Sequence, residues 1–358
     1  MEIIWNIVQF AIIFSVLLFV HEGGHFIMCR LARVPVEEFG FGLPPRIIKL
    51  FTWQGTVFSI NALPFGAFVR PRGEVERLVE GGLANASPIK KLGVYFGGPI
   101  SNLLLGLLLL FILFFQLGTP DTSKVLITGI AQGSPADLSG LTTGDQVISI
   151  NGSKINSIED MQISVTDNLG KPIQIEVIRN NEALVMEATP RVTPPENQGA
   201  LGVVLSNPYY PVSIGEAFKT AVHTGYRQMA EFVLLPGRLM TGAISSDQSR
   251  VVGIKGIYDM YTAAGNLDAD VTSDTTQRAP LYRLYFIATI SIALGLTNLL
   301  PIPALDGGRI VLVMPELILR RRIPQKVEKY LISISFMALL LLMIIITYQD
   351  FVNPINLP

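Results

Sequence analysis

The feature that most constrains this 358-residue chain is a set of four apolar segments. A helix needs about 20 mostly apolar residues to cross the hydrocarbon core of a bilayer. With 49% hydrophobic residues, 15% charged residues and a mean hydropathy of +0.46, the chain also has the composition of a membrane protein. The apolar runs, at about 3–29, 92–117, 284–305 and 329–348, predict four transmembrane helices within residues 1–31, 92–117, 281–308 and 329–349.

The first apolar run predicts a retained span rather than a cleaved signal peptide. No Lys or Arg precedes it, and a signal peptide needs a positive segment there.

The net charge of −1 excludes the basic surface on which nucleic-acid binding depends. The lone Cys29 cannot form an intrachain disulfide, and we expect it to be a small core residue.

Basic residues predict the orientation of the spans. Nine Lys and Arg between residues 30 and 91 face five acids, and six between residues 309 and 329 face two. Since cytoplasmic connections carry the excess of Lys and Arg, both connections should be cytoplasmic. We therefore expect both termini and the long 118–283 segment on the opposite side of a cell (inner) membrane, as in a multi-pass protein.

Residues 122–192 read as a small inserted domain of short strands. Gly133-Ser134-Pro135-Ala136, Gly144-Asp145 and Asn151-Gly152 punctuate it, and an alternating strand at Ile173–Arg179 leads into a turn at Asn180-Asn181. These motifs resemble a PDZ domain of the bacterial membrane-protease type. The resemblance implies an extracytoplasmic domain that binds a peptide C-terminus or strand, or one that gates substrates by size.

Two further segments follow this domain. Apolar spacing within 208–242 predicts an amphipathic helix, which could lie on the membrane surface or pack on protein. The polar stretch 264–277 predicts a loop.

A metal-binding pattern ends the first apolar run, at His21-Glu22-Gly23-Gly24-His25. Residues four apart share one face of a helix, so His21 and His25 can bind one zinc ion, with Glu22 beside them as general base. Placing such residues in a span costs about 2.5 kcal/mol or more each, which favours a functional site. Zinc in a hydrolase keeps one position for water and lowers its pKa to about 7.

Two histidines need a third protein ligand. Asp306 is the best candidate, because it is the one charged residue between Arg283 and Arg309 and it lies at the cytoplasmic end of the third span. Weaker alternatives are His223, Glu37, Glu38 and Cys29.

The segment that contains Asp306 resembles a known family signature. Asn298-Leu299-Leu300-Pro301-Ile302-Pro303-Ala304-Leu305-Asp306-Gly307-Gly308-Arg309 is similar to the second motif of the site-2 protease family of intramembrane zinc metalloproteases. The resemblance covers the whole chain and includes the bacterial type with a single PDZ domain. It implies that Asp306 is the third zinc ligand and that Asn298 helps to bind substrate; Asn298 could instead satisfy a freed backbone carbonyl.

Two more segments agree with that family. Gly97-Gly98-Pro99-Ile100-Ser101-Asn102 is similar to its Gly-Pro-x-x-Asn element, where we expect Asn102 to serve packing. Residues 36–75 resemble its membrane-associated β-hairpin, on the cytoplasmic side, and Thr56–Ile60 is expected to offer a strand edge to an unwound substrate.

The sequence thus predicts a polytopic α-helical membrane protein with a β-hairpin and an inserted PDZ domain. The implied function is a zinc metalloendopeptidase, with one Zn²⁺ per chain, that cleaves transmembrane segments of single-pass proteins. Anti-sigma factors and remnant signal peptides are the substrates that the resemblance implies. A metal transporter gives Glu22 no role, and a non-catalytic scaffold has no need of the complete motif set.

Overall fold

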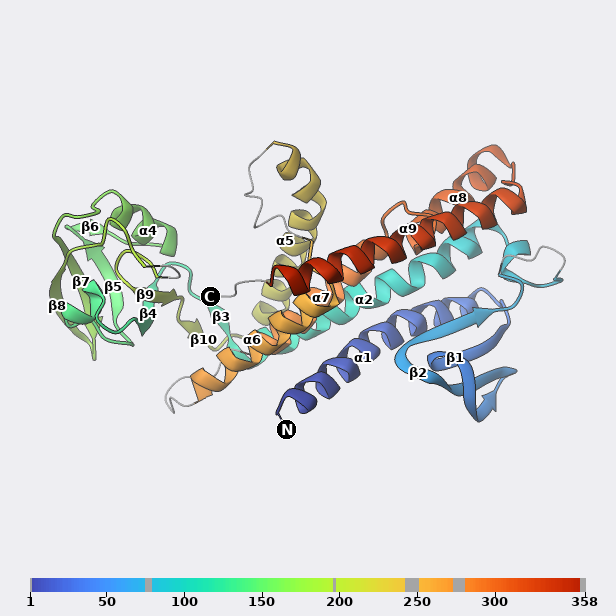
Figure 1. Cartoon of the computed structure of the whole chain (residues 1–358), viewed down its shortest axis with the longest axis horizontal. Coiled ribbons are helices and arrows are strands. Elements are labelled where there is room, and N and C mark those ends of the chain that lie inside the picture. The colour runs from blue at the N-terminus through green and yellow to red at the C-terminus, as the bar shows by residue number, and fades with distance from the viewer. Residues whose placement is uncertain (1, 75–78, 196–197, 242–250, 273–280, 355–358) are drawn as a thin grey trace. The chain divides into compact units, whose positions relative to one another are not determined.

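The computed structural model describes residues 2–74, 79–195, 198–241, 251–272 and 281–354. The chain forms two compact units. The helical unit comprises the residues up to Leu113 and from Phe218 onward, and the sheet unit comprises Phe114–Ala217 (Figure 1).

Seven helices of eight or more residues build the helical unit in the described ranges. They are α1 (Glu2–Leu31), α2 (Pro88–Leu117), α5 (Ile214–Met240), α6 (Ile254–Thr272), α7 (Tyr282–Asn298), α8 (Asp306–Leu319) and α9 (Gln325–Val352). A 3-10 turn, η1 (Leu83–Asn85), precedes α2.

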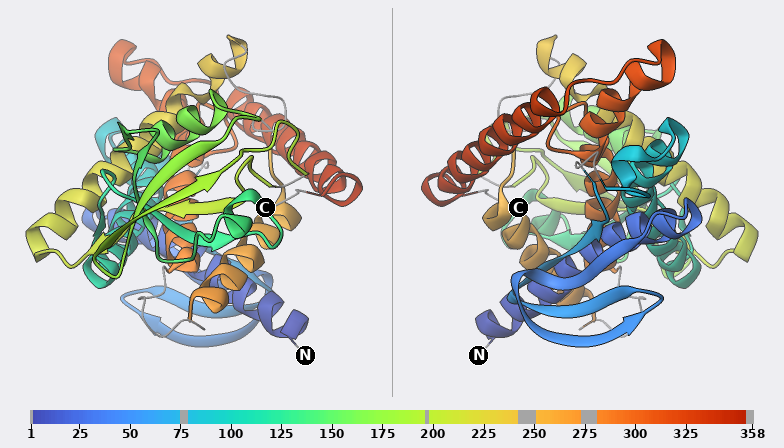
Figure 2. Two further views of the ribbon diagram at one scale, coloured as in Figure 1. Left: turned by 90° about the vertical axis from the view of Figure 1, so that its left-hand side faces the viewer. Right: turned by 90° about the vertical axis from the view of Figure 1, so that its right-hand side faces the viewer.

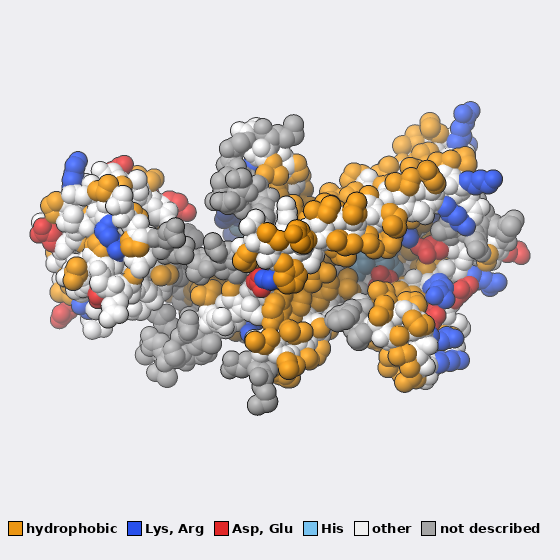
Figure 3. All heavy atoms as spheres, in the orientation of Figure 1, with side chains coloured by type: hydrophobic (Ala, Val, Ile, Leu, Met, Phe, Trp, Pro, Cys, Tyr) orange, Lys and Arg blue, Asp and Glu red, His pale blue; other side chains and the backbone are white. Residues whose placement is uncertain are grey.

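Three of the described helices are long and apolar enough to cross a membrane: Ile3–Leu31, Pro88–Leu117 and Gln325–Val352. Their apolar side chains are widely exposed, most of all on α9, whose apolar window has no buried residue (Figure 3). The expected span at 281–308 is not one helix. α7 has 17 residues and covers about 26 Å, less than the core thickness of about 30 Å. Four spans therefore remain a prediction.

The break after α7 has a simple cause. Pro301 and Pro303 have no backbone N–H to donate, and each ring clashes with the preceding helical turn. The chain consequently leaves the helix after Asn298 and begins α8 at Asp306.

Glycine brings α1 and α2 into backbone contact. A Cβ added to Gly24 would lie 2.1 Å from the carbonyl oxygen of Gly97, and one added to Gly97 would lie 2.6 Å from that of Gly24. The expected close packing of the second span on the first is therefore present. On another face of α2, a Cβ added to Gly106 would lie 2.5 Å from Cγ1 of Ile292 and 2.9 Å from the carbonyl oxygen of Ala288, both in α7.

The hairpin β1 (Val36–Trp53) and β2 (Thr56–Pro71) folds back on itself beside α1 (Figure 2). Residues 38–41 pair with 57–60 on one side and with 67–70 on the other, while 46–53 pair with 56–61. Gly42 and Gly66, with φ of 77° and 83°, lie where the strands bend. Thr56–Ile60 is thus an interior strand, and its expected role as an open edge is wrong.

The open edge is instead the last part of β2. Residues 67–70 have β1 on one side and, among the described residues, no strand on the other. This edge faces α1, where the backbone N–H of Val69 donates to Oε2 of Glu22 at 3.0 Å.

The segments predicted at 208–242 and 264–277 both contain helix. The amphipathic segment predicted at 208–242 contains α5, whose Ala217, Ala221 and Gly225 are buried. The loop predicted at 264–277 is wrong as far as Thr272, because α6 continues to that residue; 273–277 lie outside the described residues. Packing outweighs composition here, since Tyr261 is buried against Phe10 and the helix start is capped by Asp350.

The sheet unit is an antiparallel sheet in the order β8-β7-β5-β4-β9, with β6 beside β5. β7 alternates as expected, and its Ile173, Ile175 and Val177 are fully buried. Asn180 and Asn181 both have positive φ and connect β7 to β8 as a tight hairpin. The elements are β3 (Thr119–Pro120), β4 (Val125–Ile130), α3 (Pro135–Leu138), β5 (Gln146–Ile150), β6 (Ser153–Lys154), α4 (Ile158–Thr166), β7 (Ile173–Arg179), β8 (Glu182–Ala188), β9 (Val203–Ser206) and β10 (Tyr209–Tyr210), and β3 pairs with β10.

Candidate metal centre

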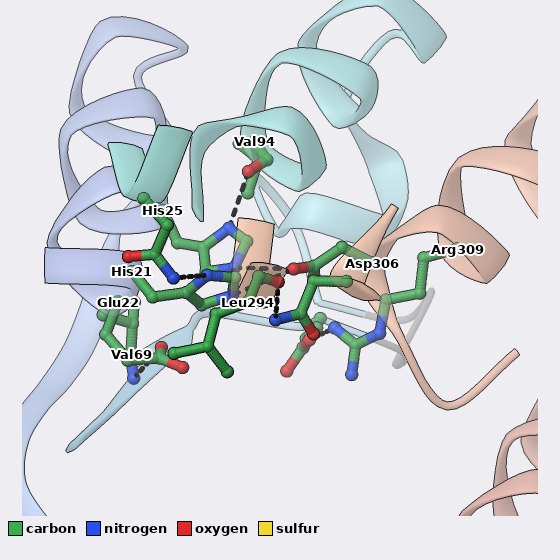
Figure 4. A network of polar contacts seen from close by, with 11 residues as sticks. His21, Glu22, His25, Val69, Val94, Leu294, Asp306 and Arg309 are labelled. Carbon is green, nitrogen blue, oxygen red and sulfur yellow. Dashed lines mark hydrogen bonds and ion pairs between the residues drawn. The ribbon is translucent and has the colours of Figure 1, made fainter. Parts of the chain in front are cut away.

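Three donor atoms from two distant helices meet at one point in the helical unit. Nε2 of His21 and Nε2 of His25 lie 3.2 Å apart, and Oδ2 of Asp306 is 3.1 Å from the first and 3.3 Å from the second. Figure 4 shows the three side chains pointing toward one another from α1 and α8. Their side chains are 7%, 12% and 11% exposed, and in the described part of the chain no other three or more His, Cys, Asp or Glu side chains cluster in this way.

The spacing of these donors fits zinc. In a tetrahedral site with zinc–ligand distances of 2.0–2.1 Å, neighbouring ligand atoms lie about 3.3 Å apart. Three such donors leave a fourth position, which is the arrangement of hydrolytic zinc sites. A Cβ at Gly98 of α2 would lie 2.4 Å from Nε2 of His25 and 2.6 Å from that of His21, so only glycine leaves this space open.

A backbone group fixes the ring of His25. Its Nδ1 lies 2.7 Å from the carbonyl oxygen of Val94, which can only accept a hydrogen bond. Nδ1 therefore carries the proton, and the lone pair of Nε2 points toward the other two donors.

Glu22 lies next to the donors on α1 and lines the same cavity. Its Oε2 accepts the bond from Val69, which ties the carboxylate to the edge of the hairpin. The cavity has a volume of about 270 Å³ and is lined by all five predicted site residues, His21, Glu22, His25, Asn298 and Asp306.

The loop before α8 depends on two glycines. A Cβ on Gly307 would lie 2.2 Å from the carbonyl oxygen of Leu299, and one on Gly308 would lie 2.1 Å from that of Ile302. The loop thus folds tightly over the start of α8, where Asp306 is the first helical residue.

Asn298 has features of both roles considered for it. Its Nδ2 donates to the carbonyl oxygen of Leu294 at 2.9 Å, one turn back in α7. It also lines the cavity, and its Oδ1 has no hydrogen-bond partner within the described ranges.

The alternative third ligands lie elsewhere. Glu38 is bonded to Ser59 at 2.7 Å within the hairpin, and Glu37 is exposed. Cys29 is fully buried in an apolar cluster, as expected for a small core residue, and His223 is exposed on α5.

Three residues without a predicted role in the site border it, although Arg309 is part of the family motif that contains Asp306. Arg309 pairs with Glu74, and its guanidinium lies 5.7 Å from the ring centre of Tyr95. All three line the cavity. Arg309 follows Asp306 by three residues, so helical spacing could have placed it on the same face.

Asn102 also borders the site, although packing was its expected role. Its Nδ2 lies 3.3 Å from Nδ1 of His21. Its spacing of four residues from Gly98 on α2 was the available signal.

Comparisons with known proteins identify the family of the chain. Residues 9–342 match the model of peptidase family M50. A candidate zinc metalloprotease of Clostridium acetobutylicum is 31% identical over 355 residues, covering 98% of this chain and 99% of that protein. The regulator of sigma-W protease RasP of Bacillus subtilis is 27% identical, covering 96% and 98%.

A solved structure matches one part of the chain. The PDZ domain of an SdrC-like protein from Listeria monocytogenes has 17% identity and a TM-score of 0.21, covering 24% of this chain and 90% of that domain. A TM-score of this size does not establish a shared fold. The match to the family model is far more extensive: the chain belongs to peptidase family M50, the site-2 protease family, and is a zinc metalloprotease.

Proposed function

We propose that this zinc metalloprotease hydrolyses peptide bonds within the transmembrane segments of single-pass membrane proteins. The observation that carries the proposal is that Asp306 of α8 meets His21 and His25, which lie beside Glu22 on α1. The helix α1 is long and apolar enough to span a membrane. The three donors hold one zinc ion per chain. Polar groups at this position are costly in a lipid environment unless they serve a site.

The metal donors, Glu22 and Val69 have distinct tasks in the proposed reaction. A zinc ion held by the three donors supplies Lewis-acid chemistry, which polarises a carbonyl and activates water. Glu22 accepts the proton of the attacking water and then delivers it to the leaving amine nitrogen. The N–H of Val69 holds one oxygen of that carboxylate in place, which leaves the other oxygen for the proton.

Substrate binding is assigned to the open edge of β2 and to Asn298. A transmembrane helix hides its carbonyls in internal hydrogen bonds, so a segment must unwind before it is cut. The unwound segment can pair with residues 67–71 as an added strand, and Oδ1 of Asn298 can accept one of its N–H groups. Phe68, Val69 and Pro71 line the cavity, which places this edge beside the metal donors.

The proposed orientation rests on charge. Lys and Arg side chains gather at the end of the helical unit formed by the hairpin and α8 (Figure 3), and they mark the cytoplasmic side of an inner membrane. The active site then lies near the cytoplasm, and both termini and the sheet unit lie outside it.

The sheet unit is assigned the role of a PDZ domain at residues 122–192. Its sequence motifs support capture of a peptide C-terminus or strand. The relative named as a regulator of sigma-W protease supports anti-sigma factors as one substrate class. Remnant signal peptides, which the family resemblance implies, are the second class that we propose.

The test uses the purified full chain in detergent with a model single-pass substrate. Glu22→Gln should lower the cleavage rate by about 100-fold or more, because general base catalysis contributes 10²–10⁴-fold, while zinc content stays that of the wild type. Glu37→Gln, on an exposed glutamate, is the matched control and should leave the rate unchanged. Cleavage that survives in Glu22→Gln or under a zinc chelator would refute the proposal.

The strand edge is tested in the same assay with Ala67→Pro. Strand alternation gives the N–H of residue 67 the same outward direction as that of Val69, so proline removes one donor of the open edge and keeps the pairing with β1. Cleavage should fall at unchanged zinc content. An unaltered rate would exclude this edge as the docking strand.

A further inference from the structure

Asn102 is in an unusual environment for a packing residue. It is fully buried on α2, with Nδ2 3.3 Å from Nδ1 of His21. Its Oδ1 is buried and has no hydrogen-bond partner among the described residues. A buried, unpaired carbonyl oxygen costs about 1–3 kcal/mol, so this arrangement calls for a partner.

The proposed metal site, on which this inference rests, supplies that partner. If Nε2 of His21 gives its lone pair to zinc, the neutral ring carries its proton on Nδ1. That proton needs an acceptor, and an amide nitrogen is only a donor. A half-turn of the Asn102 amide exchanges its nitrogen and oxygen, which occupy nearly equivalent places. Oδ1 then accepts from Nδ1–H, which satisfies the oxygen and the ring proton, and the amide N–H groups take the place that the oxygen leaves.

One face of α2 organises both histidines. Val94, Gly98 and Asn102 are spaced by four residues and lie on the same side of the helix. The carbonyl of Val94 accepts from His25, and Gly98 leaves room at both Nε2 atoms. Asn102 completes the row opposite His21. Its backbone is held in turn by Ser291 of α7, whose Oγ donates to the Asn102 carbonyl at 2.8 Å.

We propose that Asn102 is a positioning residue whose amide oxygen accepts the Nδ1–H of His21 and holds the ring in the tautomer that binds zinc through Nε2. It does not touch substrate or metal. Partners of this kind typically contribute about 10- to 100-fold in metal affinity.

The experiment measures zinc affinity of the full chain in detergent, by competition with a chromophoric chelator, so that no proteolysis is required. Asn102→Leu removes the acceptor at similar volume and should weaken zinc binding by about 10- to 100-fold. Asn102→Asp keeps an acceptor oxygen and should bind within a few-fold of wild type. Leu104→Ala, at a position on the same helix where the side chain is 60% exposed, is the control and should bind as wild type does.

The outcomes separate the possible explanations. Equal affinity of wild type and Asn102→Leu would overturn the role of Asn102, as would a folded Asn102→Asp that loses affinity as Asn102→Leu does, because a donor would then be the required group. A wild type that fails to bind zinc would instead refute the metal site itself.

A second measurement on the unaltered chain does not depend on any variant folding. The sequence has three histidines, so ¹⁵N-histidine NMR can observe each ring. With zinc bound, the ring of His21 should carry its proton on Nδ1 and bind the metal through Nε2. A ring bound to zinc through Nδ1 would overturn the proposal.

Discussion

The metal end of the helical unit and the interior of the sheet unit are built by different means. The sheet unit has a core of apolar side chains that includes Ile127, Ile150 and Ile175. At the metal end, α1 and α2 instead meet through the backbones of Gly24 and Gly97, and polar groups are buried between helices. The stability of the sheet unit comes from buried apolar area. At the metal end, the spacing of the helices determines whether the donor atoms meet.

This difference predicts two kinds of sensitivity. A small side chain added at the metal end should remove function while the protein stays folded. An apolar side chain removed from the sheet unit should lower stability while the zinc donors stay in place. The following predictions test that separation.

The largest effect is expected for Gly98→Ala. The new methyl group would lie 2.4 Å and 2.6 Å from the two Nε2 atoms and displace at least one of them. Misplacement of reacting groups by about 1 Å can cost 100-fold in rate, so zinc content should fall and cleavage should drop by about that factor or more. The helix propensity of alanine exceeds that of glycine by about 1 kcal/mol. The substitution should therefore not lower thermal stability by weakening the helix α2.

The control for Gly98→Ala is Gly23→Ala, in the zinc motif itself. A Cβ at Gly23 meets nothing within 4 Å, so this variant should keep its zinc and its activity. Metal analysis of the purified chain measures the zinc content. Full zinc occupancy in Gly98→Ala would contradict the view that the spacing of the helices at the metal end determines zinc binding.

The parts of this site that the sequence predicts are those set by local geometry. The spacing of His21 and His25 fixes them on one helical face, and the charge of Asp306 beside an apolar segment singled it out. The bond between Glu22 and Val69 was not foreseeable, because strand pairing and the fold-back of the hairpin depend on contacts between residues far apart in sequence. Asn102 was assigned to packing for the same reason.

Composition was misleading where tertiary contacts decide. The polar segment after Ala264 suggested a loop, yet α6 continues through it, held by Tyr261 and by the carboxylate of Asp350 at its first turn. Asp350 comes from the far end of α9, almost 100 residues later. A local sequence pattern cannot predict a helix cap whose carboxylate comes from such a distant residue.

An intermediate effect is expected for Ile175→Ala in the sheet unit. Ile175 is fully buried in the middle of β7, and truncation of such a side chain typically costs about 2–5 kcal/mol. Protease resistance of the sheet unit in the full chain should fall, while zinc affinity stays unchanged. Val185→Ala on β8, where the side chain is 64% exposed, is the control and should be nearly neutral. Joint loss of stability and zinc would show that the two regions are not separate.

The smallest effect concerns acid sensitivity of the sheet unit through Asp145. Burial acts to raise the pKa of this carboxyl, but the bonds from Arg179 at 2.6 and 2.8 Å and from the N–H of Thr142 at 2.9 Å outweigh it, and the pKa is lowered. A lowered pKa in the folded state means that the ionised carboxylate stabilises the fold above the unfolded value of about 3.9. This contribution is lost as the pH falls from that value through the folded pKa.

Asp145→Asn isolates this contribution. The variant should be less stable than wild type at neutral pH. The difference should shrink as the pH falls below about 4, because the unfolded wild-type chain binds a proton there, whereas the folded carboxyl binds it only at lower pH. Asp167→Asn, at an exposed position on the same unit, should show no such convergence. Thermal unfolding of the sheet unit across pH 3–7 measures both. If the Asp145→Asn difference in stability were constant over that range, the shape of the Asp145 side chain rather than its charge would account for its role. The stability of the sheet unit would then rest on packing, with no contribution from the charge of this residue.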